Sequence, residues 1–133
     1  MNKRIVILLI EDDADDVEIL VNALKTHNVD FELQLLQDGE AAVSFFQDSQ
    51  NSSFPDIIIM DLNLPRIHGR EILVEYNNSR HAHIPLIVFT TSSSKDDELF
   101  ATKNRANKFL IKPNTIDGLS EVINSIKELT SKN

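Results

Sequence analysis

The stretch IVILLIEDDADD, residues 5–16, decides the fold. Its first half, Ile5–Ile10, is a run of six large apolar residues without polar alternation, which is typical of a parallel strand covered on both faces. Its second half is acidic and begins where that strand should end. The spacing of apolar residues over 17–24 then predicts an amphipathic helix. The sequence therefore predicts a strand, an acidic turn and a helix, in that order.

The alternation of strand and helix repeats along the rest of the chain. Further strands are predicted at Phe31–Leu36, Asp56–Met60, Pro85–Phe89 and Lys108–Ile111. Further helices are predicted at Glu40–Gln47, Arg70–Tyr76, Lys95–Asn104 and Leu119–Leu129. Right-handed crossovers turn such a series into an α/β fold, a doubly wound five-stranded parallel sheet (βα)5 with the flavodoxin-like order 2-1-3-4-5. We expect one domain over residues 1–133, with no output domain.

Composition and charge exclude several classes of function. The chain has 133 residues, no cysteine and a formal net charge of −8, so disulfide scaffolds, thiolate metal sites and cysteine nucleophiles are excluded. Binding to nucleic acid or an anionic membrane is disfavoured, because both need clustered cations. The apolar run Ile5–Ile10 is too short for a signal peptide or a membrane span, so we expect a cytoplasmic protein.

The charge is unevenly distributed along the chain. Residues 1–66 hold 13 acids and 4 bases, whereas residues 67–133 hold 8 acids and 9 bases. Within the acidic run, we interpret Asp13 as a helix N-cap and Asp15 and Asp16 as solvated residues at a helix start.

Chemically active residues follow four of the five predicted strands: Glu11 and Asp12, Asp61, Thr90, and Lys112. The first and third strands are neighbours in the predicted order, so their carboxylates should converge. Two carboxylates about 5 Å apart repel by roughly 3 kcal/mol at an effective dielectric near 20. Oxygen ligands without Cys or His favour Mg²⁺ as the compensating cation. The set is suited to holding a phosphoryl group beside a carboxylate nucleophile.

Four motifs resemble those of response-regulator receiver domains of two-component signalling. They are IEDD at 10–13, DLNLPRIHG at 61–69, FTTS at 89–92 and FLIKP at 109–113, in the family's order and spacing. The resemblance covers essentially the whole chain. It is strongest to stand-alone receivers that accompany phytochrome-type and other hybrid sensor kinases.

The resemblance implies a phosphorylation site at Asp61, with a sensor histidine kinase or phosphotransfer protein as the phosphodonor. It also implies that Asp12 binds Mg²⁺ directly and Glu11 through water, while Asp61 and the backbone carbonyl of Asn63 complete the protein ligands. The acyl phosphate would later be hydrolysed in the same site, at a rate that Asn63 and Ser92 tune.

The resemblance assigns the remaining site residues as well. Thr90 would be the switch hydroxyl that moves toward the phosphoryl group, and Lys112 would pair with that group. The Lys112–Pro113 bond is expected to be cis, as it commonly is in the family. The signal would leave through the face formed by the fourth helix, fifth strand and fifth helix, at about residues 95–131. A downstream protein is the expected partner, and homodimerisation is possible.

The chain also departs from the family pattern. Phe109 stands where many receivers have a switch Tyr, so output by burial of the ring rather than by a hydroxyl contact is the hypothesis. Arg105 stands where the family often has Gly, which predicts a turn into the fifth strand that is either strained or different from the family's. His81 and His83 lie in a polar loop and are expected to be exposed.

Three other functions remain as alternatives. A Mg²⁺-dependent phosphohydrolase could use Asp61 as its nucleophile, although such enzymes usually carry an acid two residues later, where this chain has Asn63. A flavin or nucleotide module would need a Gly-rich first turn, and the turn here is EDDADD. A pseudo-receiver that is never phosphorylated is disfavoured by the intact set of acids, Thr and Lys.

Overall fold

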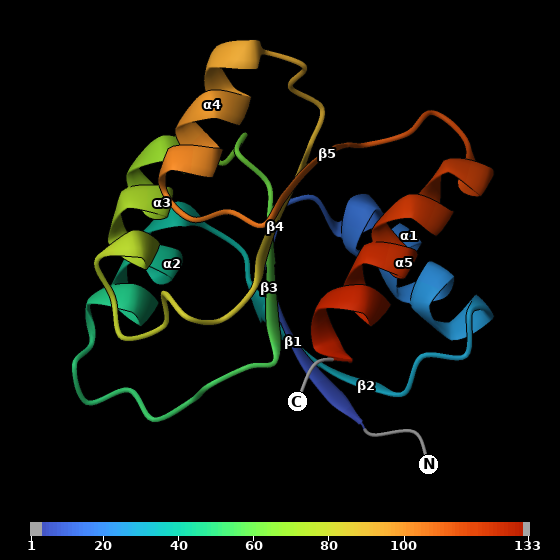
Figure 1. Cartoon of the computed structure of the whole chain (residues 1–133), viewed down its shortest axis with the longest axis horizontal. Helices are drawn as coiled ribbons and strands as arrows, with labels where there is room; N and C mark the ends of the chain where they lie inside the picture. The colour runs from blue at the N-terminus through green and yellow to red at the C-terminus, as the bar shows by residue number, and fades with distance from the viewer. Residues whose placement is uncertain (1–3, 132–133) are drawn as a thin grey trace.

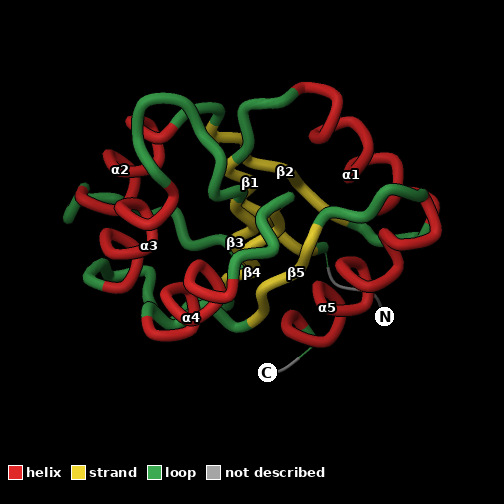
Figure 2. Tube along the Cα trace, turned by 90° about the horizontal axis from the view of Figure 1, so that it is seen from above, coloured by secondary structure: helices red, strands yellow, loops and turns green. Residues whose placement is uncertain are grey.

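The computed structural model describes residues 4–131 and confirms the predicted sheet. Five parallel strands lie in the order β2-β1-β3-β4-β5. The strands are β1 Ile5–Ile10, β2 Phe31–Leu36, β3 Ile57–Met60, β4 Leu86–Thr90 and β5 Lys108–Ile111. The helices are α1 Ala14–Thr26, α2 Gly39–Gln47, α3 Gly69–Asn77, α4 Lys95–Lys103 and α5 Leu119–Thr130, with a 3₁₀ turn at Ile116–Gly118. Helices α2, α3 and α4 cover one face of the sheet, and α1 and α5 cover the other (Figures 1 and 2).

Alternate residues of the central strands face two separate cores. In β1, Ile7 and Leu9 pack into the core under α1 and α5, while Leu8 and Ile10 pack into the core under α2, α3 and α4. This two-sided burial is why the strands are continuous apolar runs. None of the helices within residues 4–131 is long and apolar enough to span a lipid bilayer.

The register of the sheet brings the strand ends together at one edge. Ile10 of β1 pairs with Met60 of β3, so the residues that follow them, Glu11 and Asp61, are neighbours. Thr90 of β4 pairs with Ile111 of β5, directly before Lys112. The backbone ladder continues past the strands, because Asp61 N donates to Ile10 O at 3.0 Å and Lys112 N donates to Thr90 O at 2.7 Å. The chemically active residues are therefore fixed by sheet hydrogen bonds.

A close backbone approach closes the loop that follows β3. A Cβ atom at Gly69 would lie 2.5 Å from the Cα of Leu62, and Gly69 N donates to Leu62 O at 3.1 Å. Only glycine allows this approach. The loop is thereby held against the start of α3, directly beside Asp61.

The prediction that His81 is exposed was wrong. Its side chain is only 1% exposed, because the polar loop before β3 folds over it. The His81 ring stacks on Phe54 with centroids 4.8 Å apart, and its Nε2 lies 2.8 Å from Ser53 O. His81 Nδ1 has no hydrogen-bond partner among the described residues. His83 is exposed, as predicted.

Candidate functional site

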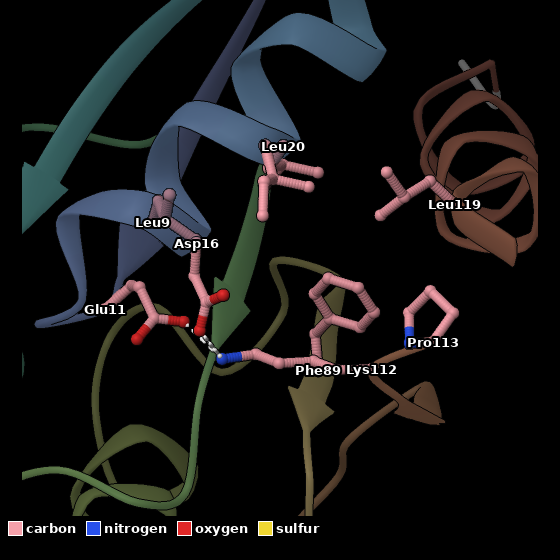
Figure 3. A pocket seen from close by; sticks show the side chains of 9 residues that line it. Leu9, Glu11, Asp16, Leu20, Phe89, Lys112, Pro113 and Leu119 are labelled. Carbon is pink, nitrogen blue, oxygen red and sulfur yellow. Dashed lines mark hydrogen bonds and ion pairs between the residues drawn. The ribbon is translucent and has the colours of Figure 1, made fainter. Parts of the chain in front are cut away.

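The ammonium group of Lys112 is the centre of the site. Its Nζ lies 2.7 Å from Glu11 Oε1, 2.8 Å from Asp61 Oδ2 and 2.8 Å from Asp16 Oδ2. Figure 3 shows the carboxylates of Glu11 and Asp16 meeting at this ammonium. A lysine ammonium has three N–H donors, so each one has a carboxylate partner. The predicted convergence of Glu11 and Asp61 is observed, with Lys112 between them.

Burial makes this charge cluster strongly coupled. The side chains of Glu11, Asp61 and Lys112 are 5%, 7% and 11% exposed. Burial would lower the pKa of Lys112, but hydrogen bonds to Asp16, Asp61 and Glu11 raise it above its ordinary value. Burial raises the pKa of Glu11, and its contact with Lys112 opposes this increase. Three carboxylates face a single ammonium, so the cluster retains an excess of negative charge.

Both oxygens of Asp61 have a partner. One contacts Lys112, and Oδ1 accepts a hydrogen bond from the backbone N of Asn63 at 3.0 Å. A carboxylate held in this way, at the end of a buried strand and beside a cation, can act as a nucleophile with a fixed orientation.

Hydroxyl and amide groups form the other side of the site. Thr90 is fully buried, and its Oγ1 accepts a hydrogen bond from Ser92 N at 3.3 Å. The amide nitrogen of exposed Asn63 lies 3.5 Å from Thr90 Oγ1 and 3.1 Å from Thr91 Oγ1. Asn63 therefore links the loop after β3 to the end of β4.

The donor set has the chemistry of a site for a hard divalent cation. Glu11 and Asp61 supply buried carboxylates from adjacent strands, and Asp12 supplies an exposed one. Within residues 4–131, no three His, Cys, Asp or Glu side chains are grouped closely enough to form a metal site by themselves. The excess negative charge and the oxygen-only donors nevertheless fit Mg²⁺, which keeps several waters and needs only one or two protein carboxylates.

The prediction of a cis bond between Lys112 and Pro113 was wrong. The peptide bonds of the described chain are all trans. The trans form is the intrinsically favoured one for X-Pro bonds.

Asp16 is the site residue that the sequence analysis missed, since we interpreted it as a solvated residue at a helix start. It is four and eight residues before Leu20 and Leu24, both of which are buried. Residues at i, i+4 and i+8 share one face of a helix, so this spacing indicates that Asp16 faces the sheet. Asp13 is the N-cap of α1, as predicted, with its carboxylate accepting from Asp15 N and Asp16 N.

The two departures from the family pattern lie in β5 and in the turn before it. Phe109 is half-buried and packs against the core under α2, α3 and α4. Arg105 has a φ of 74°, so of the two predicted outcomes for the turn before β5 the strained backbone is the one observed.

Comparisons with known proteins agree with this fold. Residues 7–124 match the family model of the response regulator receiver domain. The chain is 38% identical over 126 residues to response regulator Rcp1 of Synechocystis sp.. The aligned region covers 92% of this chain and 86% of Rcp1.

Two solved structures resemble the chain over nearly its whole length. The phosphorylated cyanobacterial phytochrome response regulator RcpA has a TM-score of 0.84 and 29% identity, covering 98% of each chain. The Mn²⁺-bound form of Rcp1 has a TM-score of 0.79 and 38% identity, covering 93% of this chain and 92% of Rcp1. The sheet order, the acidic strand ends and these similarities lead to one conclusion. The chain belongs to the response regulator receiver domain family.

Proposed function

We propose that this chain is a phosphorelay response regulator whose Asp61 accepts a phosphoryl group from the phosphohistidine of a sensor kinase or phosphotransfer protein. The observation that carries the proposal is the buried Asp61 carboxylate, 2.8 Å from Lys112 Nζ at the carboxyl edge of the sheet. The similarity to Rcp1 and to phosphorylated RcpA supports it. A cytoplasmic location, where such kinases expose their phosphohistidines, is part of the proposal.

In the proposed reaction, an Asp61 carboxylate oxygen attacks phosphorus as the bond from phosphorus to the histidine nitrogen breaks. Lys112 then pairs with the added phosphoryl charge, which is about −1.5 to −2. Asp12, Glu11, Asp61 and the backbone carbonyl of Asn63 would hold Mg²⁺. When bound, the metal would offset the carboxylate charge and polarise the phosphoryl group.

Thr90 would signal that the site is phosphorylated. Its hydroxyl is buried and accepts only long hydrogen bonds, from Ser92 N at 3.3 Å and Asn63 Nδ2 at 3.5 Å, so little holds it in place. Movement of Thr90 toward the phosphoryl group would let the ring of Phe109 shift within the adjacent core. Asn63 and Ser92 would tune the lifetime of the acyl phosphate, as the resemblance to the family implies.

The proposed output surface is α4, β5 and α5. Leu99 and Ile111 are exposed there, 59% and 51% respectively, which suits docking of a downstream protein or a second copy of the chain. We propose that residues 1–133 act as a single receiver domain through this surface.

The test is incubation with acetyl phosphate and Mg²⁺, followed by intact-mass measurement. We expect one added phosphoryl group, absent with a chelator and absent in Asp61→Asn, but present in the control Asp15→Asn, whose side chain is exposed. Phosphorylation that persists in Asp61→Asn would contradict the proposal. Steady turnover of generic phosphate esters without a trapped phosphoprotein would favour the phosphohydrolase. Asn63 disfavours that enzyme, because it places an amide where such enzymes usually carry an acid.

A further inference from the structure

Asp16 contacts the site from a helix, whereas Glu11, Asp61 and Lys112 all follow strands. Its Oδ2 lies 2.8 Å from Lys112 Nζ, as close as the acceptor Asp61. The Asp16 side chain is 36% exposed, so water can still reach the side chain that replaces it. The proposed reaction gives roles to Glu11, Asp61 and Lys112 and leaves Asp16 without one.

The hydrogen-bonding capacity of Lys112 makes the contact with Asp16 consequential. All three ammonium donors are used by Glu11, Asp16 and Asp61. A phosphoryl group on Asp61 brings new acceptor oxygens to the same ammonium, so at least one existing contact must lengthen or break. Asp16 is the most exposed of the three carboxylates, and water can solvate it when Lys112 leaves.

A small pocket gives Lys112 and Asp16 room to rearrange. It has a volume of about 60 Å³ and lies between α1 and α5 (Figure 3). Its polar lining is Glu11, Asp16 and Lys112, and its apolar lining includes Leu20 and Leu119. This volume is sufficient for water molecules to replace a lost ion pair at the polar end.

We propose that Asp16 is a positioning residue that competes with the phosphoryl group for Lys112. It holds the ammonium toward α1 in the unphosphorylated protein and releases it when Asp61 carries a phosphoryl group. Asp16 thereby weakens the binding of an anion at Asp61 while adding negative charge that attracts the metal. This inference rests on the proposed phosphorylation of Asp61.

The experiment compares Asp16→Asn with Asp15→Asn. The second variant is the control, because it removes the same charge from the neighbouring residue, whose side chain is exposed. Beryllofluoride is the probe, because it mimics a phosphoryl group without chemical turnover. Its affinity is measured by calorimetry at saturating Mg²⁺, and the affinity for Mg²⁺ alone is measured separately. For Asp16→Asn we expect beryllofluoride to bind about twofold to fivefold more tightly, the range typical of a partly exposed ion pair. We expect Mg²⁺ to bind more weakly, and Asp15→Asn to resemble the unmodified chain in both measurements.

Nuclear magnetic resonance of Lys112 gives a readout that a purely structural role would not change. The ¹⁵Nζ shift should move in Asp16→Asn and stay fixed in Asp15→Asn, before any analogue is added. Equal beryllofluoride affinities in the two variants, or weaker binding in Asp16→Asn, would overturn the inference and leave the proposed function intact. If the unmodified chain binds no beryllofluoride with Mg²⁺ present, the proposed function fails and this inference fails with it.

Discussion

Tyr76 is the only tyrosine of the chain, and it is 1% exposed. Its hydroxyl donates to Ile84 O at 2.6 Å and also lies 3.2 Å from Ala82 O, which fastens α3 to the segment before β4. Burial raises the pKa of Tyr76 to about 12, against a smaller opposing effect of Arg105. The phenol is therefore a titratable reporter of the folded state.

We predict that stability falls as the pH rises from about 10 to about 12. In this interval the unfolded chain loses the Tyr76 proton while the folded chain keeps it, so the folded state binds more protons. The loss attributable to Tyr76 is about 2–3 kcal/mol. Because the chain has no tryptophan, the near-ultraviolet absorbance of tyrosinate measures the titration directly. Tyr76→Phe is the control, and its stability should fall less over the same interval. A folded-state midpoint near 10 would contradict the prediction.

Single residues were predictable where the backbone fixes their place. Glu11, Asp61, Thr90 and Lys112 lie at or just after strand ends, so sheet order and register determine their proximity. Asp16 and His81 depend on where a side chain points and on how a loop folds, which composition does not reveal. Asp16 still had a signal, its helical spacing from Leu20, whereas His81 is buried only because the loop with Ser53 and Phe54 covers it. The contacts made by irregular loops are therefore the part of the structure that could not be predicted from the sequence.

Helix α4 is anchored differently from the other helices. Ala101 is its only buried residue, which confirms the thin apolar content predicted for it. Its first turn is instead tethered by Asp97, which accepts from Ser92 Oγ at 2.8 Å and contacts Arg70 Nη2 at 2.7 Å. Hydrogen bonds from the Ser92 hydroxyl and the Arg70 side chain lower the pKa of Asp97, so its carboxylate is charged and the tether is present at neutral pH. Since Ser92 N also donates to Thr90 Oγ1, this tether joins the site to the proposed output surface.

We predict that Asp97→Ala loosens α4 without unfolding the domain. Loss of the tether should cost about 1 kcal/mol and raise amide hydrogen exchange over residues 95–103 by about fivefold. Exchange in β1 and β3 should be unchanged, because both strands are buried in the sheet. Asp96→Ala is the matched control, since it removes the same charge from the same helical turn at an exposed position. Equal exchange in the two variants would show that the contacts of Asp97 do not hold the helix.

All ten predicted strands and helices are present, and their bounds shift by only a few residues. α1 begins at Ala14, directly after the Asp13 cap that the sequence predicts and three residues before the apolar stripe that starts at Val17. β4 begins at Leu86 rather than Pro85, since Pro has no N–H for the ladder. The 3₁₀ turn before α5 carries no apolar periodicity and was not predicted. Element type follows from hydrophobic pattern, whereas element ends depend on caps.

At the scale of the whole molecule, part of the net charge of −8 is concentrated at one edge of the sheet. The sheet gathers the acidic ends of β1 and β3 at one edge, where Glu11, Asp16 and Asp61 outnumber the single cation Lys112. Self-repulsion at this edge works against folding unless a cation is added. The fold and the proposed metal site are therefore thermodynamically linked.

Mg²⁺ should consequently stabilise the folded chain. A ligand that binds only the folded state at 100 times its Kd adds about 2.7 kcal/mol to the free energy of unfolding. We expect thermal unfolding, followed by circular dichroism, to move to higher temperature with Mg²⁺ than with a chelator at equal ionic strength. The increment should be largely lost in Asp61→Asn and in Asp12→Asn, and largely kept in Asp15→Asn. If Mg²⁺ acts only by screening the net charge, NaCl at the same ionic strength should raise the unfolding temperature by the same amount in every variant. That result would contradict stabilisation through the proposed metal site.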